Sequence, residues 1–352
     1  MLYQDEDETA ISTHSMIKTF RRCPKQMEYK YIRRLKPKLV SLPLKRGSWL
    51  HEMLEAYYKG EDPWEVHAHL SLKFSELFEE EREDYGDLPG DCRRIFESYL
   101  WHYQNDDWDV KDVEFTLETN FPDGALYRCK IDMLVEDEYG LWLVDHKTHK
   151  VLPDHDFRIL DSQSGLYLWA ALKNKIPVQG FIFNYLRTKA PTIPQPIKSG
   201  ARISRWDQVD TDFPTARAAL KKHGFMTKKK VIPYMPKLKR LAALKYEYGA
   251  PQNSPFFRRD VVEKSPEMIK KIAMEGYHTH QRMHDYFPPP HEDAVERVPD
   301  RSCQYMCSYT ALCSTELWGG NTTAILKQYK EGDPLDYYGD SESKEEDIIH
   351  GG

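Results

Sequence analysis

Two aspartates and a lysine near the ends of two consecutive predicted strands form the first candidate site. Asp132 lies near the end of one strand, and thirteen residues later the next strand closes with Asp145, His146 and Lys147. Because a hairpin can bring such strand ends together, the two carboxylates and the carbonyl oxygen of His146 could provide hard oxygen ligands for Mg²⁺ or Mn²⁺. Lys147 projects to the same face as Asp145, where its ammonium could orient an attacking water or offset phosphate charge. The alternative is an ordinary surface pair on a strand edge.

The sequence around these residues resembles the PD-(D/E)XK nuclease superfamily, and in particular its RecB-like branch. The run IDMLVEDEYGLWLVDHKT, residues 131–148, has the order of that branch's hallmark strands, an ID strand followed by a DYKT-type segment. The resemblance implies that Asp132, Asp145 and Lys147 occupy the two acidic positions and the lysine position. His146 stands where an aromatic or other residue is more usual, and its expected contribution is its backbone.

Two further segments extend the resemblance toward the metal site. In RGSWLHEMLEAYY, residues 46–58, Gly47 and His51 resemble the glycine and the metal-binding histidine that open the RecB-like motif on its first helix. A purely structural histidine is the alternative. In DVEFTLET, Glu114 resembles a family glutamate that supports the metal site. Glu118 competes for this assignment, and a solvated strand face is an equally favoured alternative.

A later helix supplies two polar residues of the same family pattern. The segment DSQSGLYLWA resembles the family's Q-x-x-x-Y element, with Gln163 and Tyr167 one helical turn apart. The resemblance implies that both face the site, where they could bond a phosphate or orient Lys147.

The cysteines form a second candidate site. Cys303, Cys307 and Cys313 are compactly spaced, and Cys23 lies 280 residues before the first of them. In a protein kept inside the cell, such clusters favour metal over disulfides. Spacing alone leaves zinc and an iron–sulfur cluster about equally favoured, with unligated core thiols as a third alternative. The arrangement resembles the iron–sulfur staple of AddB-type and CRISPR-associated RecB-like nucleases, which implies a 4Fe–4S cluster. The other cysteines are interpreted as buried thiols: Cys92 and Cys129.

Hydrophobic periodicity indicates which elements position these residues. Helices are predicted from a cap at Ser12 or Thr13 to Met27 and over residues 44–58, 64–83, 92–104, 162–174, 213–223, 266–286 and 322–328. Strands are predicted over residues 110–119, 125–136, 141–147 and 178–186. A sheet, a helix and a returning strand predict an α/β fold. Its expected form is a mixed central sheet flanked by helices, the restriction-endonuclease-like core, with an N-terminal helical part and an iron–sulfur staple.

Six segments are expected along the chain. They are a disordered start (1–11), a helical region with the first cluster cysteine and the metal histidine (12–105), the nuclease core (106–187), a basic DNA-binding insert (188–260), a C-terminal helix with the cysteine cluster (261–330) and an acidic disordered tail (331–352). Four histidines are interpreted as solvated rather than as a second metal patch: His278, His280, His284 and His291.

The charge distribution is strongly polarised. The formal net charge is -6, yet residues 187–259 contain 17 basic and four acidic residues, a local charge of about +13. This local excess favours a polyanionic partner. No stretch approaches the roughly 18 apolar residues of a membrane-spanning helix, and the acidic start is unlike a signal peptide, so we expect no membrane partner and a cytoplasmic location. For a phage-encoded protein this would be the cytoplasm of the bacterial host.

The function expected from these features is a Mg²⁺- or Mn²⁺-dependent DNA exonuclease acting on single strands or ends, in phage or bacterial recombination, repair or replication. One alternative is a DNA-binding or assembly module with a silent site. Another is a CRISPR-adaptation nuclease, although 352 residues exceed the compact size of that subgroup and the insert resembles longer phage exonucleases. The chain has no phosphate-binding loop of a helicase motor, so any unwinding requires a helicase or recombination partner.

Overall fold

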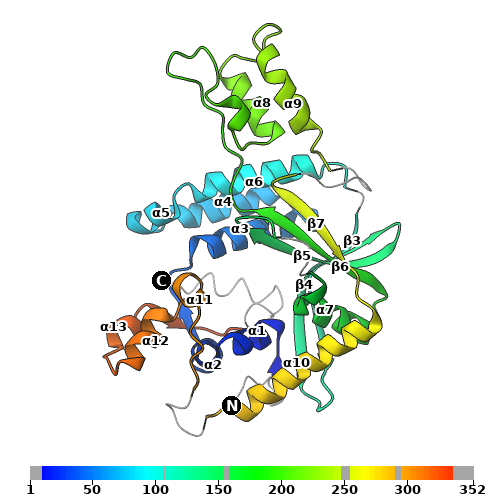
Figure 1. Ribbon diagram of the computed structural model, residues 1–352, viewed down its shortest axis with the longest axis vertical. Helices are drawn as coiled ribbons and strands as arrows, with labels where there is room; N and C mark the ends of the chain where they lie inside the picture. The colour runs from blue at the N-terminus through cyan, green and yellow to red at the C-terminus, as the bar shows by residue number, and fades with distance from the viewer. Residues whose placement is uncertain (1–9, 107, 154–157, 247–253, 290–294, 336–352) are drawn as a thin grey trace.

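The computed structural model of the chain describes residues 10–106, 108–153, 158–246, 254–289 and 295–335, and its centre is a six-stranded mixed sheet (Figure 1). The strands are β1 (Ile11–Ser12), β3 (Asp109–Asn120), β4 (Leu126–Asp137), β5 (Gly140–His149), β6 (Val178–Arg187) and β7 (Phe257–Val262). Their order is β1-β4-β5-β6-β7, and β3 also pairs with β4. The hairpins β3–β4 and β4–β5 are antiparallel, whereas β5 and β6 are parallel. The predicted mixed α/β fold is therefore confirmed.

Helices cover both faces of this sheet (Figure 1). The crossover from β5 to β6 contains α7 (Ser162–Lys173), which packs with α10 (Pro266–Tyr286) and α1 (His14–Arg22) over one large apolar core. On the other face lie α3 (Leu42–Lys59), α4 (Pro63–Ser75) and α6 (Leu88–His102) over a second core. Both cores are made by residues at helical spacing on one side and strand alternation on the other, as the periodicity predicts.

Several predicted boundaries change in the structure. The helix expected over residues 64–83 is two helices, because the chain breaks after α4 and resumes as α5 (Glu79–Tyr85). Thr13 is the cap of α1, since its side chain accepts from the amide of Met16 at 3.2 Å. The strand β7 was not predicted, and it crosses the expected boundary at residue 260.

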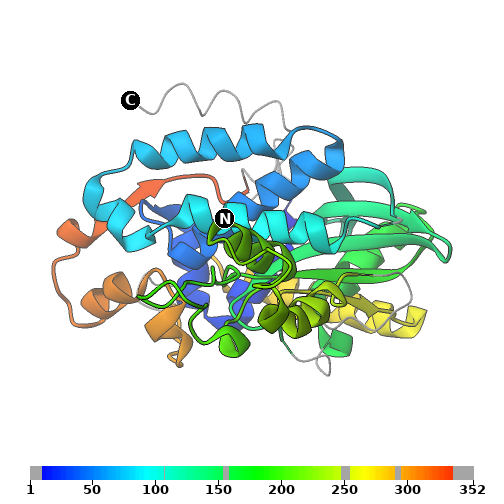
Figure 2. The ribbon, with the colours of Figure 1, turned by 90° about the horizontal axis from the view of Figure 1, so that it is seen from above.

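The basic insert between β6 and β7 forms a small lobe around α8 (Phe213–Lys222) and α9 (Met235–Ala242). Its core contains Trp206, Tyr234 and Leu238, which explains why this short segment can fold beside the sheet. The lobe lies at one end of the molecule, above α6 in Figure 1. In Figure 2, which views the molecule from that end, the lobe lies in front of α6. It contacts α6 through the stacked rings of Trp101 and Phe213, whose centroids are 5.2 Å apart.

The two ends of the described chain meet in a separate small unit. A short β2 (Leu35–Pro37) pairs antiparallel with β8 (Tyr329–Glu331), beside α2 (Pro24–Met27), a π-helix (Glu28–Ile32), α11 (Ser302–Tyr305), α12 (Thr310–Leu317) and α13 (Thr323–Leu326). Glu316 of α12 accepts from Tyr29 at 2.6 Å and from Arg33 at 2.7 Å. These contacts tie the N-terminal helices to the C-terminal ones.

Both expected disordered ends contain ordered residues. Ile11 belongs to β1 and is buried, because it pairs with Leu126 of β4. Glu331 lies in β8 and Leu335 is 6% exposed, so the tail does not begin at residue 331. The expectations for residues 1–9 and 336–352 lie outside the described residues. Across the described residues, none of the helices combines the length and apolar character needed to span a bilayer.

Candidate active site

The candidate site lies where β4 and β5 separate. These strands pair from Asp137 and Gly140 up to Met133 and Val144, and the pairing ends there. Beyond this point β4 continues along β3, whereas β5 continues along β6 to His149. Such a fork opens a space between two strands that are held firmly on their outer sides. The next residues along the two strands, Asp132 and Asp145, therefore stand at the entrance of the fork. The predicted position near the strand ends is wrong, because both residues lie in the middle of their strands.

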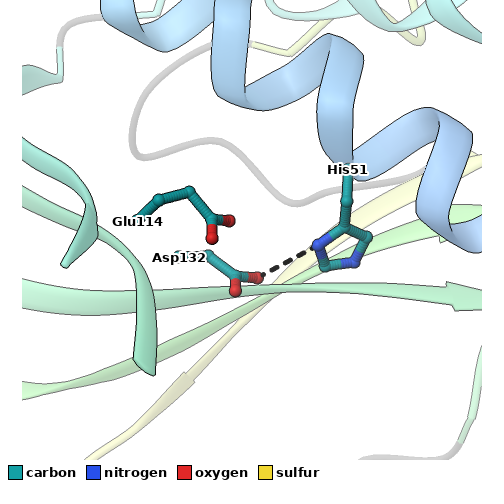
Figure 3. Close-up of side chains that lie close together, drawn as sticks. All are labelled: His51, Glu114 and Asp132. Carbon is teal, nitrogen blue, oxygen red and sulfur yellow. Dashed lines mark ion pairs between the residues drawn. The ribbon is translucent and has the colours of Figure 1, made fainter. Parts of the chain in front are cut away.

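Three side chains from three elements converge at this fork (Figure 3). His51 comes from α3, Glu114 from β3 and Asp132 from β4, and one ligand atom of each lies within 4.8 Å of the others. The Nδ1 atom of His51 is 3.6 Å from Oδ2 of Asp132, which is longer than a hydrogen bond. This spacing fits two atoms that would each lie about 2.1 Å from one shared ion. In the described part of the chain, no other three histidine, cysteine, aspartate or glutamate side chains converge in this way.

The backbone at Glu114 explains why this glutamate, and not Glu118, joins the group. Glu114 has a φ of 57°, in the left-handed region that a residue with a Cβ rarely adopts. This conformation costs about 1–3 kcal/mol, and such strain is concentrated at functional sites. Glu118 instead pairs on the surface with Arg128, at 2.6 Å. The structure thus favours Glu114 between the two alternatives that the sequence left open.

Close packing of α3 against β5 positions His51. A Cβ atom at Gly47 would lie 3.0 Å from Oγ1 of Thr148, tighter than most real contacts. The glycine therefore allows the helix to approach the strand, and one turn later His51 reaches the fork. The predicted pairing of this glycine with this histidine has a steric reason in the fold.

Asp145 and Lys147 lie beside the group of three rather than in it. The Nζ atom of Lys147 is 2.5 Å from Oδ2 of Asp145. Gln163 of α7 donates from Nε2 to Oδ1 of the same carboxylate at 2.6 Å. Gln163 thus contacts Asp145, which in turn contacts Lys147, and Tyr167 lines the same pocket one turn later. The expected contact of Gln163 and Tyr167 with a phosphate stays a prediction.

His146 connects the two strands at the fork. Its backbone N–H donates to Oδ2 of Asp132 at 2.7 Å. Its ring is buried on the side of α3, where it stacks on Tyr58 with centroids 5.8 Å apart. The expected role of its carbonyl as a metal ligand stays a prediction.

Burial and crowding of charge set the protonation of the site. Burial raises the pKa of Asp132 well above its usual range, and the charges of Asp145 and Glu114 raise it further. Burial lowers the pKa of His51, so its imidazole is neutral, the form that binds metal ions. Burial alone would lower the pKa of Lys147, but Asp145 and Asp132 raise it overall. The ammonium of Lys147 is therefore protonated at neutral pH.

The pocket around these residues carries an excess of negative charge. It has a volume of about 880 Å³ and is lined by six carboxylates but only two ammonium groups, those of Lys130 and Lys147. A phosphodiester would be repelled by this lining, whereas a divalent cation would be attracted to it. Imidazole together with carboxylate oxygens is a donor set suited to Mg²⁺ or Mn²⁺. The residues present therefore fit a divalent metal ion.

The structure does not support the predicted cysteine site. All four cysteines are free thiols, and in the described residues no three of their sulfur atoms come within 4.8 Å of one another. A tetrahedral zinc site needs thiolates at about 2.3 Å from one ion, hence close together. Neither the predicted 4Fe–4S cluster nor its zinc alternative is supported for the following residues: Cys23, Cys303, Cys307 and Cys313. Cys307 and Cys313 instead pack, partly buried, against an apolar cluster that contains Tyr29 and Leu312.

The predictions for the other two cysteines are confirmed, whereas those for the four histidines are confirmed only in part. Cys92 and Cys129 are buried, as predicted. The prediction that His280 is solvated is wrong, because it is 2% exposed and its Nδ1 lies 2.7 Å from Oγ of Ser12. His284 is half-buried and His278 is exposed, while His291 lies outside the described residues.

Sequence reasoning missed Lys130, whose Nζ lies 2.9 Å from Oε2 of Glu114. The signal that could have found it is strand alternation, since Lys130 stands two residues before Asp132 on β4. Its ammonium offsets the charge of Glu114 inside the pocket.

Comparison with known proteins identifies the family. The model of the PD-(D/E)XK nuclease superfamily matches residues 12–314. This chain belongs to that superfamily. A search of the curated proteins gives no match.

A search of the solved structures gives matches of low overall similarity, including the following two. The crystal structure of SSO0001 is 11% identical, with a TM-score of 0.29, over 88% of this chain and 87% of that one. A provisionally named exonuclease from Eubacterium rectale is 14% identical, with a TM-score of 0.35, over 69% of this chain and 90% of that one. The nuclease assignment rests on the family match and not on these two structures.

Proposed function

We propose that this nuclease hydrolyses DNA with Mg²⁺ or Mn²⁺ and acts from strand ends. The observation that carries the proposal is the convergence of His51, Glu114 and Asp132 next to the Asp145–Lys147 pair. His51, Glu114, Asp132 and Asp145 would hold the ion, which when bound polarises the phosphoryl oxygens and lowers the pKa of water.

Gln163 and Lys147 have separate roles beside the proposed metal ligands. Gln163 and Lys147 hold the two oxygens of Asp145, so this carboxylate has a fixed orientation. The charges of Asp145 and Asp132 raise the pKa of Lys147, which favours its ammonium form over a role as general base. Its ammonium instead positions a water and offsets negative charge that develops on the phosphate in the transition state.

The basic lobe would attract the negatively charged DNA backbone, which the acidic pocket repels. Its exposed cations include Lys221, Lys222, Lys228, Lys229 and Lys230. A polyanion bound there gains electrostatic free energy that depends on salt. The proposed division is therefore a basic lobe that holds DNA and an acidic pocket that cuts it.

The part played by His51 favours the RecB-like branch within the superfamily. A helix-borne histidine beside an ID strand and a D-x-K strand is the pattern that this chain shares with that branch. From the branch we infer exonuclease action and a role in recombination, repair or replication of phage or bacterial DNA. A CRISPR-adaptation role is the second possibility within the same branch.

Digestion of labelled DNA tests the proposal. Linear DNA labelled at the 5′ or the 3′ end and a closed circular DNA are incubated with the protein and Mg²⁺ or Mn²⁺, with a chelator as control. We expect the linear substrates to lose mononucleotides or short products and the circle to survive. Cutting of the circle would replace exonuclease with endonuclease action.

Asp145→Asn is the matched variant, because it keeps the shape of a side chain that contacts both Gln163 and Lys147. It should abolish digestion while DNA binding persists. Equal inactivity of wild type and variant, with binding retained, would instead favour a silent DNA-binding module.

A further inference from the structure

We propose that Asn184, Tyr99 and Tyr58 form a positioning chain that fixes His146 and, through it, two residues of the metal group. The inference rests on the proposed function, since it assigns these residues a role toward that same site. Asn184 and Tyr99 lie outside the sequence motifs, and Tyr58 ends the segment 46–58 without a role assigned to it there. All three lie on the side of the sheet covered by α3 and α6.

The positioning chain consists of consecutive hydrogen bonds in which Asn184 and Tyr99 are buried and Tyr58 is half-buried. Asn184 of β6 donates from Nδ2 to the hydroxyl of Tyr99 at 2.8 Å. The same nitrogen lies 2.9 Å from Nδ1 of His146. The hydroxyls of Tyr99 and Tyr58 are 2.6 Å apart. Asn184 and Tyr99 are both 0% exposed, so no solvent competes for these bonds.

This arrangement selects one tautomer of His146. An amide nitrogen only donates, so Nδ1 of His146 accepts and the ring proton resides on Nε2. The bond from Asn184 on one side of the ring and the stacked ring of Tyr58 together give His146 one preferred orientation.

His146 passes this orientation to the metal group in two ways. Its backbone N–H holds Oδ2 of Asp132 at 2.7 Å. Its ring meets the ring of His51 edge-on, with centroids 5.8 Å apart and an interplanar angle of 78°. Two of the three residues that converge at the fork therefore contact His146 directly. A change in the position of His146 must move a carboxylate, an imidazole or both.

Arg259 anchors the far end of the chain. Its guanidinium makes two bonds to Asp106, at 2.7 and 2.5 Å, and reaches the hydroxyl of Tyr58 at 3.5 Å. It also lies over the rings of Trp108 and Tyr103, 3.3 and 3.9 Å from their centroids. Arg259 belongs to β7, the first strand after the basic lobe. The positioning chain thus joins the root of the lobe to the metal group.

The test compares two substitutions of the same kind. Tyr99→Phe removes the hydroxyl that links Asn184 and Tyr58 in the positioning chain. Tyr103→Phe removes a buried hydroxyl that has no hydrogen-bond partner among the described residues, although its ring touches that of Tyr99. Residues behind metal ligands typically contribute about 10–100-fold to metal affinity or activity. We expect Tyr99→Phe to weaken Mn²⁺ binding by about tenfold and to lower kcat by a similar factor, with KM for DNA unchanged and Tyr103→Phe like wild type.

A measurement on the metal-free protein keeps this test independent of activity. The ¹⁵N chemical shifts of His146 should report a proton on Nε2 in the wild type and a mixture of tautomers in Tyr99→Phe. A proton on Nδ1 in the wild type, or equal Mn²⁺ affinity in Tyr99→Phe and Tyr103→Phe, would overturn the inference. If the wild type binds Mn²⁺ and responds to Tyr99→Phe without cutting DNA, the positioning chain stands and the proposed function fails.

Discussion

Lys130 and Glu114 form an ion pair of 2.9 Å inside the pocket, directly beside Asp132. Glu114→Gln removes the negative charge while it keeps the side-chain shape. We expect Mn²⁺ affinity, measured by isothermal titration calorimetry, to fall by about 10–100-fold, the usual effect of losing a carboxylate near a metal ion.

Glu118→Gln is the matched control on the same strand. Glu118 pairs with Arg128 at the surface and should leave Mn²⁺ affinity within about twofold of wild type, since exposed ion pairs contribute little. A larger effect of Glu118→Gln than of Glu114→Gln would contradict the assignment of Glu114 to the site.

Lys147 should contribute to the rate and not to metal binding. Its ammonium contacts Asp145 at 2.5 Å and competes there with a cation. Lys147→Ala is therefore expected to lower the single-turnover rate of DNA cleavage by about 10²–10⁴, as for other groups that act on the transition state, with Mn²⁺ affinity unchanged or higher. Lys150→Ala, an exposed lysine three residues later, serves as the control. Parallel losses of rate and metal affinity in Lys147→Ala would show that Lys147 only holds the site together.

The order of elements and the strand-borne site residues could be predicted because both are local. Asp145 follows the apolar run 141–144, Asp132 stands in the alternating strand before it, and the short turn at residues 137–140 favours a hairpin. Their convergence is therefore a consequence of chain connectivity. Glu114 could not be separated from Glu118, because the choice depends on a left-handed φ that no residue pattern signals.

Long-range contacts account for what sequence reasoning missed or mistook. The sequence of β7 did not indicate a strand because it contains charged residues. Arg259 can be buried there because Asp106 and Trp108, from an earlier part of the chain, contact its guanidinium. The cysteine spacing suggested a metal site because spacing gives the order of sulfur atoms and not their distances. In the structure, pairing of β2 with β8 joins the two ends instead.

The lobe should determine how DNA affinity depends on salt. Each phosphate contact changes the slope of log K against log salt by about 0.7 for single strands and 0.9 for duplex DNA. Replacing Lys228 and Lys229 by Gln should therefore reduce the slope by about 1.4 to 1.8 in fluorescence anisotropy titrations. The control replaces Lys270 and Lys271, which are exposed on α10, away from the lobe in Figure 1. Equal changes in both double variants would mean that net charge, and not the lobe, sets the affinity.

His280 should make the protein sensitive to acid. Burial and the charge of His284 lower the pKa of His280 from 6.5 to about 4, so between these values the unfolded chain binds the proton and the folded protein does not. The contribution of neutral His280 to the free energy of unfolding is therefore complete above pH 6.5 and is lost as the pH falls to 4. At 1.36 kcal/mol per pH unit, the loss amounts to about 3 kcal/mol at most. Urea unfolding at several pH values should show a weaker loss in His280→Gln than in wild type. His278→Gln, an exposed change on the same helix, should follow wild type, and a His280→Gln curve parallel to wild type would contradict the assignment.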